Sequence, residues 1–509
     1  MRWFWVACTV VLAFQFAALV GYSTFLFHRF DLTDDFATYS QAWWLIGHGH
    51  LNPVDTVQVP NYPFVRSHAE LAMWPLALVG RLWPNPVQLL WMQDAALVAT
   101  EWLAMTWVAA RCADRLGRRR TVVAGVALVF LVVNPWWYLT ASFDVHFETL
   151  GLPFVVGTAY ALWCGRPRTA LVLALVALLF GDVVAVSVLA VGVAGLLSRR
   201  VRRGTGWRWP ALVAAAAALF LVVIAVAGAD RGSGVVVNYG YLVGAGPTAS
   251  STQIVVRLLL HPWHALRVLV GRWPAMLRVL ASAGLVGVVT PWGLVLSLGI
   301  LAPAALNANP AFLTPAIAFQ SLGVIPFVFV GTVLVLVRIG TGPHDRRPTR
   351  PEATASGRRG RSVAVVLAAV LGAVSLVSSA GLYGTVATGW WRVDAPAASV
   401  LRDVLPVIPG SAQVIASQGV IGRFAGRVDV YPFVASPQSF PVRSHRVVFV
   451  IAPDQGIESV PPAAAEASVA SLERLPGTTV LARLHGVTVV EWRPPPGTTA
   501  IVLPGPVVG

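Results

Sequence analysis

Phe30-Asp31-Leu32-Thr33-Asp34-Asp35-Phe36 follows shortly after an apolar run that extends from Trp3 to Phe27. This run is long enough to cross a bilayer, because about 20 residues span the hydrocarbon core. Three carboxylates therefore lie within five residues at the end of a predicted membrane helix, and we call residues 30–36 the acid turn. Acids at a membrane interface are costly unless they are solvated, paired or functional. The acid turn is either a solvated loop whose Thr33 or Asp34 caps the next helix, or a functional site.

The composition places the chain among membrane proteins. Of its 509 residues, 56% are hydrophobic and only 12% are charged, which is more apolar surface than a soluble globular protein needs. The sequence contains no lysine, so all 37 basic residues are arginine, and the net charge is +15. Because the arginines cluster in short loops between apolar runs, they indicate membrane orientation, and we expect no nucleic-acid partner. The cysteines Cys8, Cys112 and Cys164 have neither disulfide nor zinc spacing.

The apolar runs predict an all-α polytopic membrane bundle of about eleven transmembrane helices in residues 1–388. The arginine-rich loops place the N-terminus in the cytoplasm and leave two large outer loops, residues 28–86 and 229–278. Two helix pairs are short: residues 168–198 turn at Gly181-Asp182, and residues 279–306 break at Thr290-Pro291. Without these two pairs the bundle has nine crossings and the same end topology.

The composition changes from about Trp390 onward. Apolar runs there shorten to the length of strands, and helical patterns lie between them. We predict a small extracytoplasmic α/β domain in residues 389–493, followed by a loose tail in residues 494–509.

The candidate functional side chains all fall on the outer side of this topology. The first outer loop contributes Asp34, Asp35, Gln41, His68 and Glu70. Mostly apolar helices would then present polar groups at one membrane surface, which suits a site at the boundary of lipid and water.

The second, short outer loop is Asp144-Val145-His146-Phe147-Glu148, and Asp182 begins the helix after the third outer turn. In a strand, Asp144, His146 and Glu148 would share one face, as ligands of a divalent metal. The alternative is an ordinary polar loop whose acids lie at a helix N-terminus, where the helix dipole favours them. We assign no cofactor, and leave the metal open.

Two further sets of charged residues have alternative interpretations. Residues 254–280 predict an amphipathic interfacial helix broken by Pro262 and Pro274. Its Arg257 and Arg272 either grip a phosphate in a guanidinium fork or attract anionic headgroups. Asp94 and Glu101 lie seven residues apart on one helix face, so they form either a buried polar pairing or a proton path.

Four stretches of the chain resemble a family of bacterial multi-pass membrane proteins that is known only as a domain of unknown function. That family is grouped with the GT-C-type glycosyltransferases, which use polyprenyl-phosphate sugars. The stretches are Asp35 to Trp43, Ser67 to Gln93, Phe143 to Glu148, and the C-terminal region from Val404 to Val450. Ser40 and Gly181 stand where the family usually has acids, and Ala316 to Gln320 replaces its histidine–tyrosine motif.

The resemblance implies a membrane glycosyltransferase on the outer face of the bacterial plasma membrane. Its donor would be a polyprenyl-phosphate-linked sugar, and its acceptor a glycan, lipid or protein. The resemblance implies Asp35 as the base that accepts the proton of the attacking hydroxyl, with Asp34 as its near alternative. His68, His146 and Glu148 would line the pocket, Arg257 or Arg272 would hold the lipid phosphate, and a single displacement would invert the sugar.

Two other classes of function remain open at this point. A transporter or lipid flippase would place acids at the bilayer midplane and use paired half-helices. A non-catalytic membrane assembly protein would keep the transferase shell without its chemistry, and the residues Ser40 and Gly181 favour this alternative.

Overall fold

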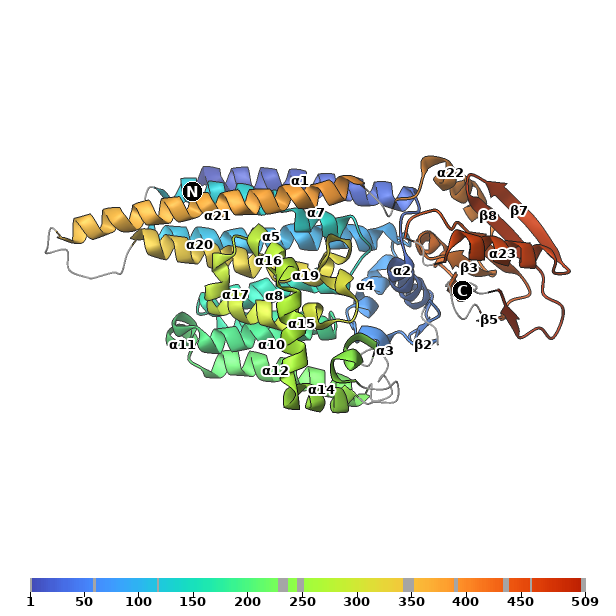
Figure 1. The fold of residues 1–509 in the computed structure, drawn as a ribbon, viewed down its shortest axis with the longest axis horizontal. Helices are drawn as coiled ribbons and strands as arrows, with labels where there is room; N and C mark the ends of the chain where they lie inside the picture. Colours follow the sequence, from blue (N-terminus) through green and yellow to red (C-terminus); the bar gives the residue numbers. More distant parts are fainter. Residues whose placement is uncertain are drawn as a thin grey trace. The chain divides into compact units, whose positions relative to one another are not determined.

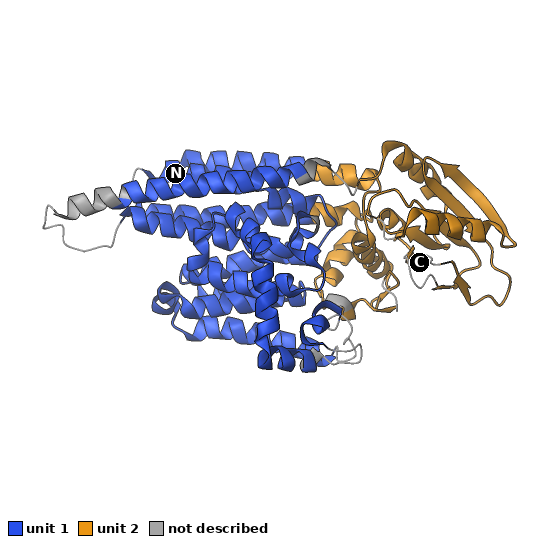
Figure 2. Cartoon of the chain, in the orientation of Figure 1, with its two compact units in different colours: residues 1–19, 93–387 blue, residues 20–92, 388–509 orange. Residues whose placement is uncertain are grey.

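The computed structural model describes residues 2–57, 61–116, 119–227, 237–244, 251–341, 352–388, 392–433, 439–457 and 460–504 (Figure 1). Parts of the large outer loop predicted for residues 229–278 (229–236 and 245–250) and the last five residues of the predicted tail lie outside this description. The chain forms two compact units (Figure 2). Met1–Leu19 and Gln93–Ala387 form the first, which we call the helical unit; Val20–Met92 and Thr388–Gly509 form the second, the α/β unit.

This division differs from the single boundary predicted after residue 388, because the first outer loop belongs to the same unit as the C-terminal region. The physical reason is a shared core. Phe30, Ala37 and Val57 are buried in one hydrophobic cluster with Val393 and Leu401. Burying these side chains together ties residues 30–57 to the C-terminal region.

The helical unit consists of helices and short turns. Its elements are α1 (Arg2–His28), α5 (Val87–Arg115), α6 (Arg120–Val132), α7 (Pro135–Ala141), α8 (Phe147–Trp163), α9 (Pro167–Leu178), α10 (Asp182–Leu197), α11 (Arg199–Thr205), α12 (Arg208–Ala227), α14 (Ser251–Leu260), α15 (Pro262–Gly271), α16 (Trp273–Ser282), α17 (Pro291–Leu296), α18 (Ala302–Leu306), α19 (Phe319–Leu322), α20 (Ile325–Thr341) and α21 (Glu352–Thr388). Residues 2–19 of α1 and residues 93–115 of α5 belong to this unit. The remaining residues of these two helices belong to the α/β unit.

Helix boundaries follow the local signals in the sequence. Pro262 and Pro291 begin helices, since proline suits the first helical turn, where its missing N–H is not needed. Thr290 caps α17 by accepting a hydrogen bond from the Gly293 N–H (3.1 Å). Gly181 has a φ of +108°, which permits the tight connection from α9 to α10. The predicted breaks at Gly181-Asp182 and Thr290-Pro291 are thus present.

The described helices offer fewer candidate membrane spans than the eleven predicted. By length and composition, five helical stretches qualify, or up to seven if each strongly bent pair counts as one span. They are Arg2–His28, Arg120–Ala141, Arg208–Ala227, Phe319–Thr341 and Ser362–Gly384. The bent pairs are α10 with α11, at 86°, and α14 with α15, at 82°. The count falls short because α8 and α9 have only 17 and 12 residues, and because α5 carries Asp94 and Glu101.

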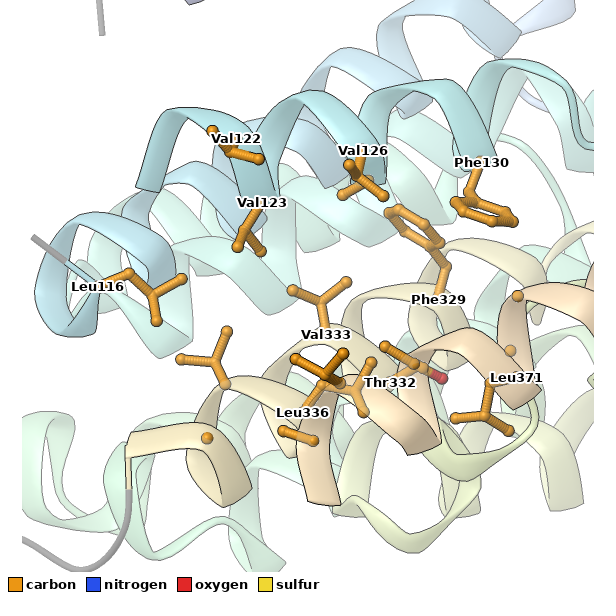
Figure 3. Close-up of a pocket in the computed structure, with 18 of the residues that line it drawn as sticks. Leu116, Val122, Val123, Val126, Phe130, Phe329, Thr332, Val333, Leu336 and Leu371 are labelled. Atoms are coloured by element: carbon orange, nitrogen blue, oxygen red, sulfur yellow. The ribbon is translucent and has the colours of Figure 1, made fainter. Parts of the chain in front are cut away.

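Helices α6, α20 and α21 of the helical unit line an apolar cavity of about 710 Å³ (Figure 3). Most of α21 is exposed: only 17% of its apolar window, Ser362–Gly384, is buried within the protein. A helix that is apolar on its outward face is typical of a membrane span.

The α/β unit is built on a five-stranded sheet with the strand order β4-β3-β6-β8-β7. Its strands are β3 (Gln413–Ser417), β4 (Val430–Phe433), β6 (Val447–Ile451), β7 (Thr478–Leu484) and β8 (Val487–Trp492). Strand β3 is parallel to β4 and β6, whereas β8 is antiparallel to β6 and β7. Every residue of β3 and β6 is buried, which is typical of central strands covered on both faces.

Two helices of this unit, α22 (Ala395–Val404) and α23 (Pro462–Glu473), pack with opposite faces of the sheet. Val414 and Val448 share a core with α22, while Ile415 and Phe449 share another with α23. This alternation follows from the two-residue period of a strand. The predicted loose tail is wrong for residues 500–502, because β9 (Ala500–Val502) pairs with β5 (Ser439–Pro441).

The first outer loop adds α2 (Asp34–Gly47), α3 (Val65–His68), α4 (Met73–Gly80) and the short hairpin of β1 (Val54–Asp55) and β2 (Tyr62–Pro63) to the α/β unit. Helix α2 packs against the 3₁₀ helix η8 (Ile421–Phe424). A Cβ atom on Gly422 would lie 2.6 Å from the Leu32 Cβ, so only glycine permits this approach. The Gly422 N–H also donates to the Leu32 carbonyl (3.0 Å). The acid turn is thus fixed directly to the C-terminal region.

Candidate functional site

The acid turn forms the entry to α2. Thr33 is the N-cap, with an extended backbone, and its hydroxyl accepts a hydrogen bond from the Asp35 N–H (3.4 Å). This confirms the capping role predicted for Thr33. Asp34 and Asp35 occupy the first helical turn, where the helix dipole stabilises negative charge. Both are partly exposed, whereas Asp31 is buried. The cap therefore places two adjacent, partly exposed carboxylates in the first turn of α2.

Asp34 is held by the C-terminal region. Its Oδ1 accepts a hydrogen bond of 2.9 Å from Nε2 of Gln418, which lies 384 residues further along the chain. Burial raises the pKa of Asp34 to about 6, and the charge of Asp35 adds to this effect, while the Gln418 hydrogen bond opposes it. A carboxyl group with a pKa near neutrality changes its protonation in the range in which general bases operate.

Arg423 is a cation beside the acid turn that the sequence did not single out. Its Cζ lies 4.5 Å from the ring centroid of Phe27 and 4.5 Å from that of Phe30. Such cation–π contacts hold the guanidinium without using its N–H groups. Arg423 forms no hydrogen bond with any residue that the structure describes. Its donors are therefore available to an anion, and no sequence motif distinguishes it from the other arginines.

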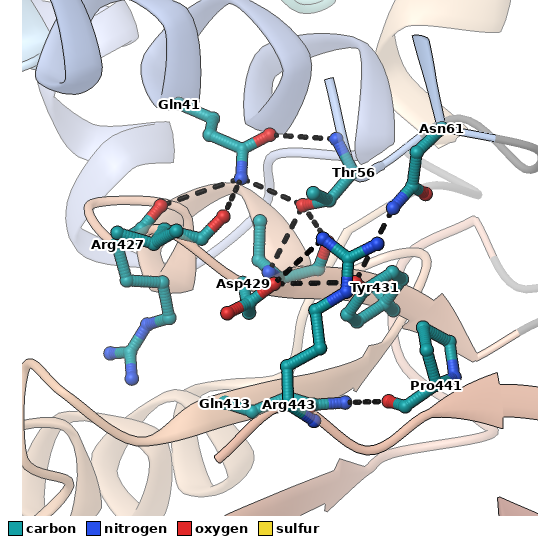
Figure 4. Close-up of polar contacts among 11 residues, drawn as sticks. Gln41, Thr56, Asn61, Gln413, Arg427, Asp429, Tyr431, Pro441 and Arg443 are labelled. Carbon is teal, nitrogen blue, oxygen red and sulfur yellow. Dashed lines mark hydrogen bonds and ion pairs between the residues drawn. The ribbon is translucent and has the colours of Figure 1, made fainter. Parts of the chain in front are cut away.

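Gln41, which was predicted to contact substrate, connects the first outer loop to the sheet. Its side chain is 1% exposed. Its Oε1 accepts from the Thr56 N–H (3.1 Å), and its Nε2 donates to the Thr56 Oγ1 (2.7 Å) and to the Val428 carbonyl (2.8 Å) (Figure 4). Thr56 in turn donates to the Val430 carbonyl of β4 (2.7 Å). Both ends of the amide are thus satisfied within the protein, and its role is structural.

Glu70 and His68 are the other two candidates of the first outer loop, and the structure describes the side chain of Glu70 alone. Glu70 is 2% exposed, and its Oε1 accepts a hydrogen bond from the Tyr39 hydroxyl (2.9 Å). This bond joins α2 to the segment before α4. His68 ends α3, and its side chain lies outside the described part of the chain.

The second outer loop is buried inside the helical unit. Gln93 of α5 holds its backbone: its Oε1 accepts from the His146 N–H (2.8 Å), and its Nε2 donates to the Asp144 carbonyl (3.1 Å). The His146 ring stacks on Phe319, and its Nδ1 lies 3.1 Å from the Asp144 carbonyl. The His146 side chain, predicted to line a pocket, is 4% exposed and packs against aromatic neighbours, Phe143 included.

Glu148 and Asp182 lie at the N-terminal ends of α8 and α10, which pack against each other. The Asp182 Oδ1 accepts from the Val183 N–H (2.9 Å). Glu148 lines a small cavity together with Val183, and its buried Oε2 has no hydrogen-bond partner among the described residues. Within the described ranges, no three His, Cys, Asp or Glu side chains group closely enough to hold a metal ion.

The arginines proposed to hold a lipid phosphate lie in the helical unit. Arg257 is exposed on α14. Arg272 instead donates through Nη1 to the Ala305 carbonyl (2.9 Å) and to the Asn307 carbonyl. These carbonyls belong to the C-terminal end of α18, where a cation is favoured by the helix dipole. Arg272 thus caps α18 in this structure, and its phosphate role stays a prediction.

Glu101 lies in the buried core of the helical unit. Its carboxyl group is fully buried, and its Oε1 accepts a hydrogen bond of 3.1 Å from Nε2 of Gln15 on α1. Asp94, which lies seven residues earlier on the same face of α5, is also fully buried. This supports the buried-pairing interpretation for Glu101, with Gln15 rather than Asp94 as the partner.

The predicted site residues thus divide between the two units. Asp34, Asp35, Gln41, His68 and Glu70 belong to the α/β unit, whereas Asp144, His146, Glu148, Asp182, Arg257 and Arg272 belong to the helical unit. The structure brings Asp34 and Asp35 together with Gln418 and Arg423, and it uses Gln41 and Arg272 for internal contacts.

A family model described as "Predicted membrane protein (DUF2079)" matches residues 29–461. The chain belongs to this family. The match includes the acid turn together with α2 and η8. It confirms the resemblance to an uncharacterised family of multi-pass membrane proteins. No curated protein matches the chain.

Among solved structures, the DUF2079 chain is similar to ArnT from Cupriavidus metallidurans, seen in crystal structures bound to undecaprenyl phosphate and in the apo state. The sequence identities are 13% and 15%, and the TM-score is 0.43 in both cases. Each comparison covers 96% of this chain and 97% of the ArnT chain.

Proposed function

We propose that this DUF2079 protein is a membrane glycosyltransferase that transfers a sugar from a polyprenyl-phosphate donor to an acceptor on the outer face of the plasma membrane. The observation that carries the proposal is the acid turn. Two adjacent carboxylates begin α2, a few residues after α1, a helix long and apolar enough to span a bilayer, and one of them has a pKa of about 6. A carboxylate pair close to the membrane surface would be accessible both to a lipid-linked donor and to an acceptor in water.

The reaction requires one proton transfer and the departure of one phosphate. The acceptor hydroxyl attacks the anomeric carbon, its proton passes to a carboxylate, and the bond from this carbon to the phosphate oxygen breaks. Asp35 is the proposed base, with Asp34 as its neighbour and alternative. Because the reaction is one displacement, we expect inversion of the anomeric configuration. With a pKa of about 6, Asp34 is mostly ionised at neutral pH, so the pair is ready to accept a proton.

Arg423 is the proposed contact for the lipid phosphate, in place of Arg257 and Arg272. Its guanidinium is held between the rings of Phe27 and Phe30, and the second of these belongs to the acid turn. A guanidinium matches phosphate oxygens with a planar fork of donors. A preformed cation near the leaving phosphate stabilises the charge that develops there.

The test is transfer of a labelled sugar from a polyprenyl-phosphate donor by membranes that contain the full chain. We expect Asp35→Asn to reduce transfer by roughly 10²–10⁴-fold, the usual contribution of a general base. Asp403→Asn is the matched control, since Asp403 is exposed on α22 and makes no described hydrogen bond. Unchanged transfer in both Asp35→Asn and Asp34→Asn, with normal folding, contradicts the proposal.

A lipid transporter is the second candidate, and one observation favours it. Glu101 is fully buried in α5 and bonded to Gln15 of α1, and ionisable groups inside membrane helices often mark transport pathways. The two candidates separate in proteoliposomes. A transporter loses movement of the lipid-linked sugar across the bilayer in Glu101→Gln and keeps it in Asp35→Asn, whereas a transferase loses sugar transfer in Asp35→Asn alone.

A further inference from the structure

A groove in the helical unit is lined by none of the predicted site residues. Side chains of α6, α20 and α21 point into it from opposite sides, as Figure 3 shows. Val126 and Phe130 face it from α6, Val333 and Leu336 from α20, and Leu371 from α21. Its volume of about 710 Å³ is large enough for a drug-sized or lipid-sized apolar group.

Glycines set where the surrounding helices touch and where they separate. A Cβ on Gly372 of α21 would lie 3.0 Å from the Phe130 ring of α6, and one on Gly340 of α20 would lie 3.4 Å from the Ala364 Cβ of α21. The helices thus approach closely at these two points.

The far end of the groove is lined by polar residues that are already satisfied. The Ser375 hydroxyl donates to the Ser282 carbonyl (2.7 Å), and the Thr332 hydroxyl donates to the Val328 carbonyl (2.8 Å). The Ser282 hydroxyl donates to the Val279 carbonyl (2.7 Å). Because these groups need no further partner, this end of the groove accepts hydrocarbon without leaving these hydroxyl groups unpaired.

The near end of the groove carries positive charge. Arg115 and Arg119 line it, beside Thr341 at the end of α20. Neither guanidinium forms an ion pair or hydrogen bond with a residue that the structure describes. The neighbouring acid, Asp114, is paired with Arg200 instead (3.4 Å). Two arginines are therefore available to an anion at one end of an apolar channel.

The length of the groove matches one leaflet. Residues from Phe329 to Thr341 of α20 line it, which corresponds to about 18 Å at 1.5 Å per residue. Half of the hydrocarbon core of a bilayer is about 15 Å thick. We propose that the groove binds one acyl chain of an anionic glycerophospholipid, whose phosphate lies against Arg115 and Arg119. This lipid would lie in the leaflet on the side of Arg115 and Arg119. Its site shares no lining residue with the acid turn.

The experiment is native mass spectrometry of the purified full chain, titrated with phosphatidylglycerol, with phosphatidylcholine and with a polyprenyl phosphate. We expect a retained phosphatidylglycerol adduct that phosphatidylcholine does not form to the same extent. Val126→Trp fills the groove and should reduce this adduct by roughly tenfold. Val129→Trp is its matched control, because Val129 is on the same helix, is 60% exposed and does not line the groove.

A second pair of variants tests the headgroup contact. Arg115→Gln with Arg119→Gln should remove most of the preference for phosphatidylglycerol, roughly tenfold for two charges near a headgroup. Arg202→Gln with Arg203→Gln changes the net charge equally at exposed positions outside the groove, and should leave the preference intact. Equal binding of phosphatidylcholine and phosphatidylglycerol, a phosphatidylglycerol adduct unaffected by Val126→Trp, or a groove that takes only the polyprenyl phosphate each overturns the proposal.

Discussion

The acid turn and the second outer loop contain the same kinds of residue, yet the structure uses them in opposite ways. In the acid turn, Thr33 caps α2 and leaves Asp34 and Asp35 partly exposed at its N-terminus. In the second outer loop, the backbone is bonded to Gln93 and the ring of His146 is buried against Phe319. Polar residues in two predicted outer loops are therefore partly exposed in one loop and buried in the other, according to what packs over them.

This difference predicts that substitutions near the acid turn alter transfer and that those in the second outer loop alter stability. After Asp35→Asn, the largest effect should follow Arg423→Gln. Loss of a preformed donor for a developing phosphate charge costs roughly 10²–10³-fold in rate. The measurement is transfer of the labelled sugar at saturating donor, with folding checked by gel filtration.

The matched control is Arg402→Gln, which removes a charge that acts on Arg423 but is exposed on α22. We expect its transfer to stay within about threefold of wild type, because single exposed charges contribute little. Equal losses in the two variants would show that net charge, rather than the guanidinium held by Phe27 and Phe30, sets the rate.

The second prediction concerns Gln93→Ala. This change leaves the buried His146 N–H and Asp144 carbonyl without their partner, and should lower the free energy of unfolding by roughly 1–3 kcal/mol. It is measured as the thermal unfolding midpoint of the purified protein in detergent. Gln320→Ala, which removes a partly buried amide without a described hydrogen bond, should have a smaller effect. A comparable fall in both would argue against the bonding role of Gln93.

The third prediction is a pH dependence with opposite signs for transfer and stability. The pKa of Asp34 is about 6 in the fold and 3.8 ordinarily, so the folded protein binds the proton more tightly. Its contribution to stability therefore rises as the pH falls from about 6 toward 3.8. Transfer should fall over the same range, by about tenfold per pH unit below 6, because the carboxylate pair gains a proton.

Asp34→Asn tests the assignment of this pH dependence. It should move the acidic limb of the transfer profile below pH 6, because the group that titrates there is gone. Rates are compared from pH 4 to 8 in membranes that remain intact throughout. An acidic limb that stays at pH 6 in Asp34→Asn would assign the titration to another group.

The smallest effect should follow His146→Phe. A ring of similar shape keeps the stack on Phe319, so the loss of stability should stay below about 1.5 kcal/mol and transfer should be nearly unchanged. Unfolding midpoints and transfer rates are measured together. A large loss of transfer with normal stability would return His146 to the site and remove the contrast between the two loops.

Several parts of the fold were predictable because they depend on local patterns. The helix breaks at Gly181 and Thr290 follow from a positive φ and a side-chain cap, and the cap at Thr33 is read from the same rules. The predicted number of spans is not confirmed, because apolar runs such as α9 are helical but shorter than the described helices that qualify as spans by length.

The candidate site was only partly predictable. Asp34 and Asp35 were identified from their spacing and from the resemblance. Arg423 was missed, because its importance comes from the rings of Phe27 and Phe30 that hold it, and no pattern around residue 423 records that contact. The internal hydrogen bonds of Gln41 were not predictable either, since a buried amide bonded to Thr56 and Val428 looks the same in sequence as one that faces a ligand.

By itself, the sequence determined that this is a polytopic membrane protein, that an acidic segment follows its first helix, and that a region of short strands ends the chain. These properties depend on composition and on the order of neighbouring residues. Only the tertiary structure decided which polar side chains are free to act. The Gln418 that holds Asp34 is 384 residues away from it, and the carbonyl of Arg427 that Gln41 contacts is 386 residues away. Burial and pairing arise from such distant neighbours, and a local pattern does not contain them.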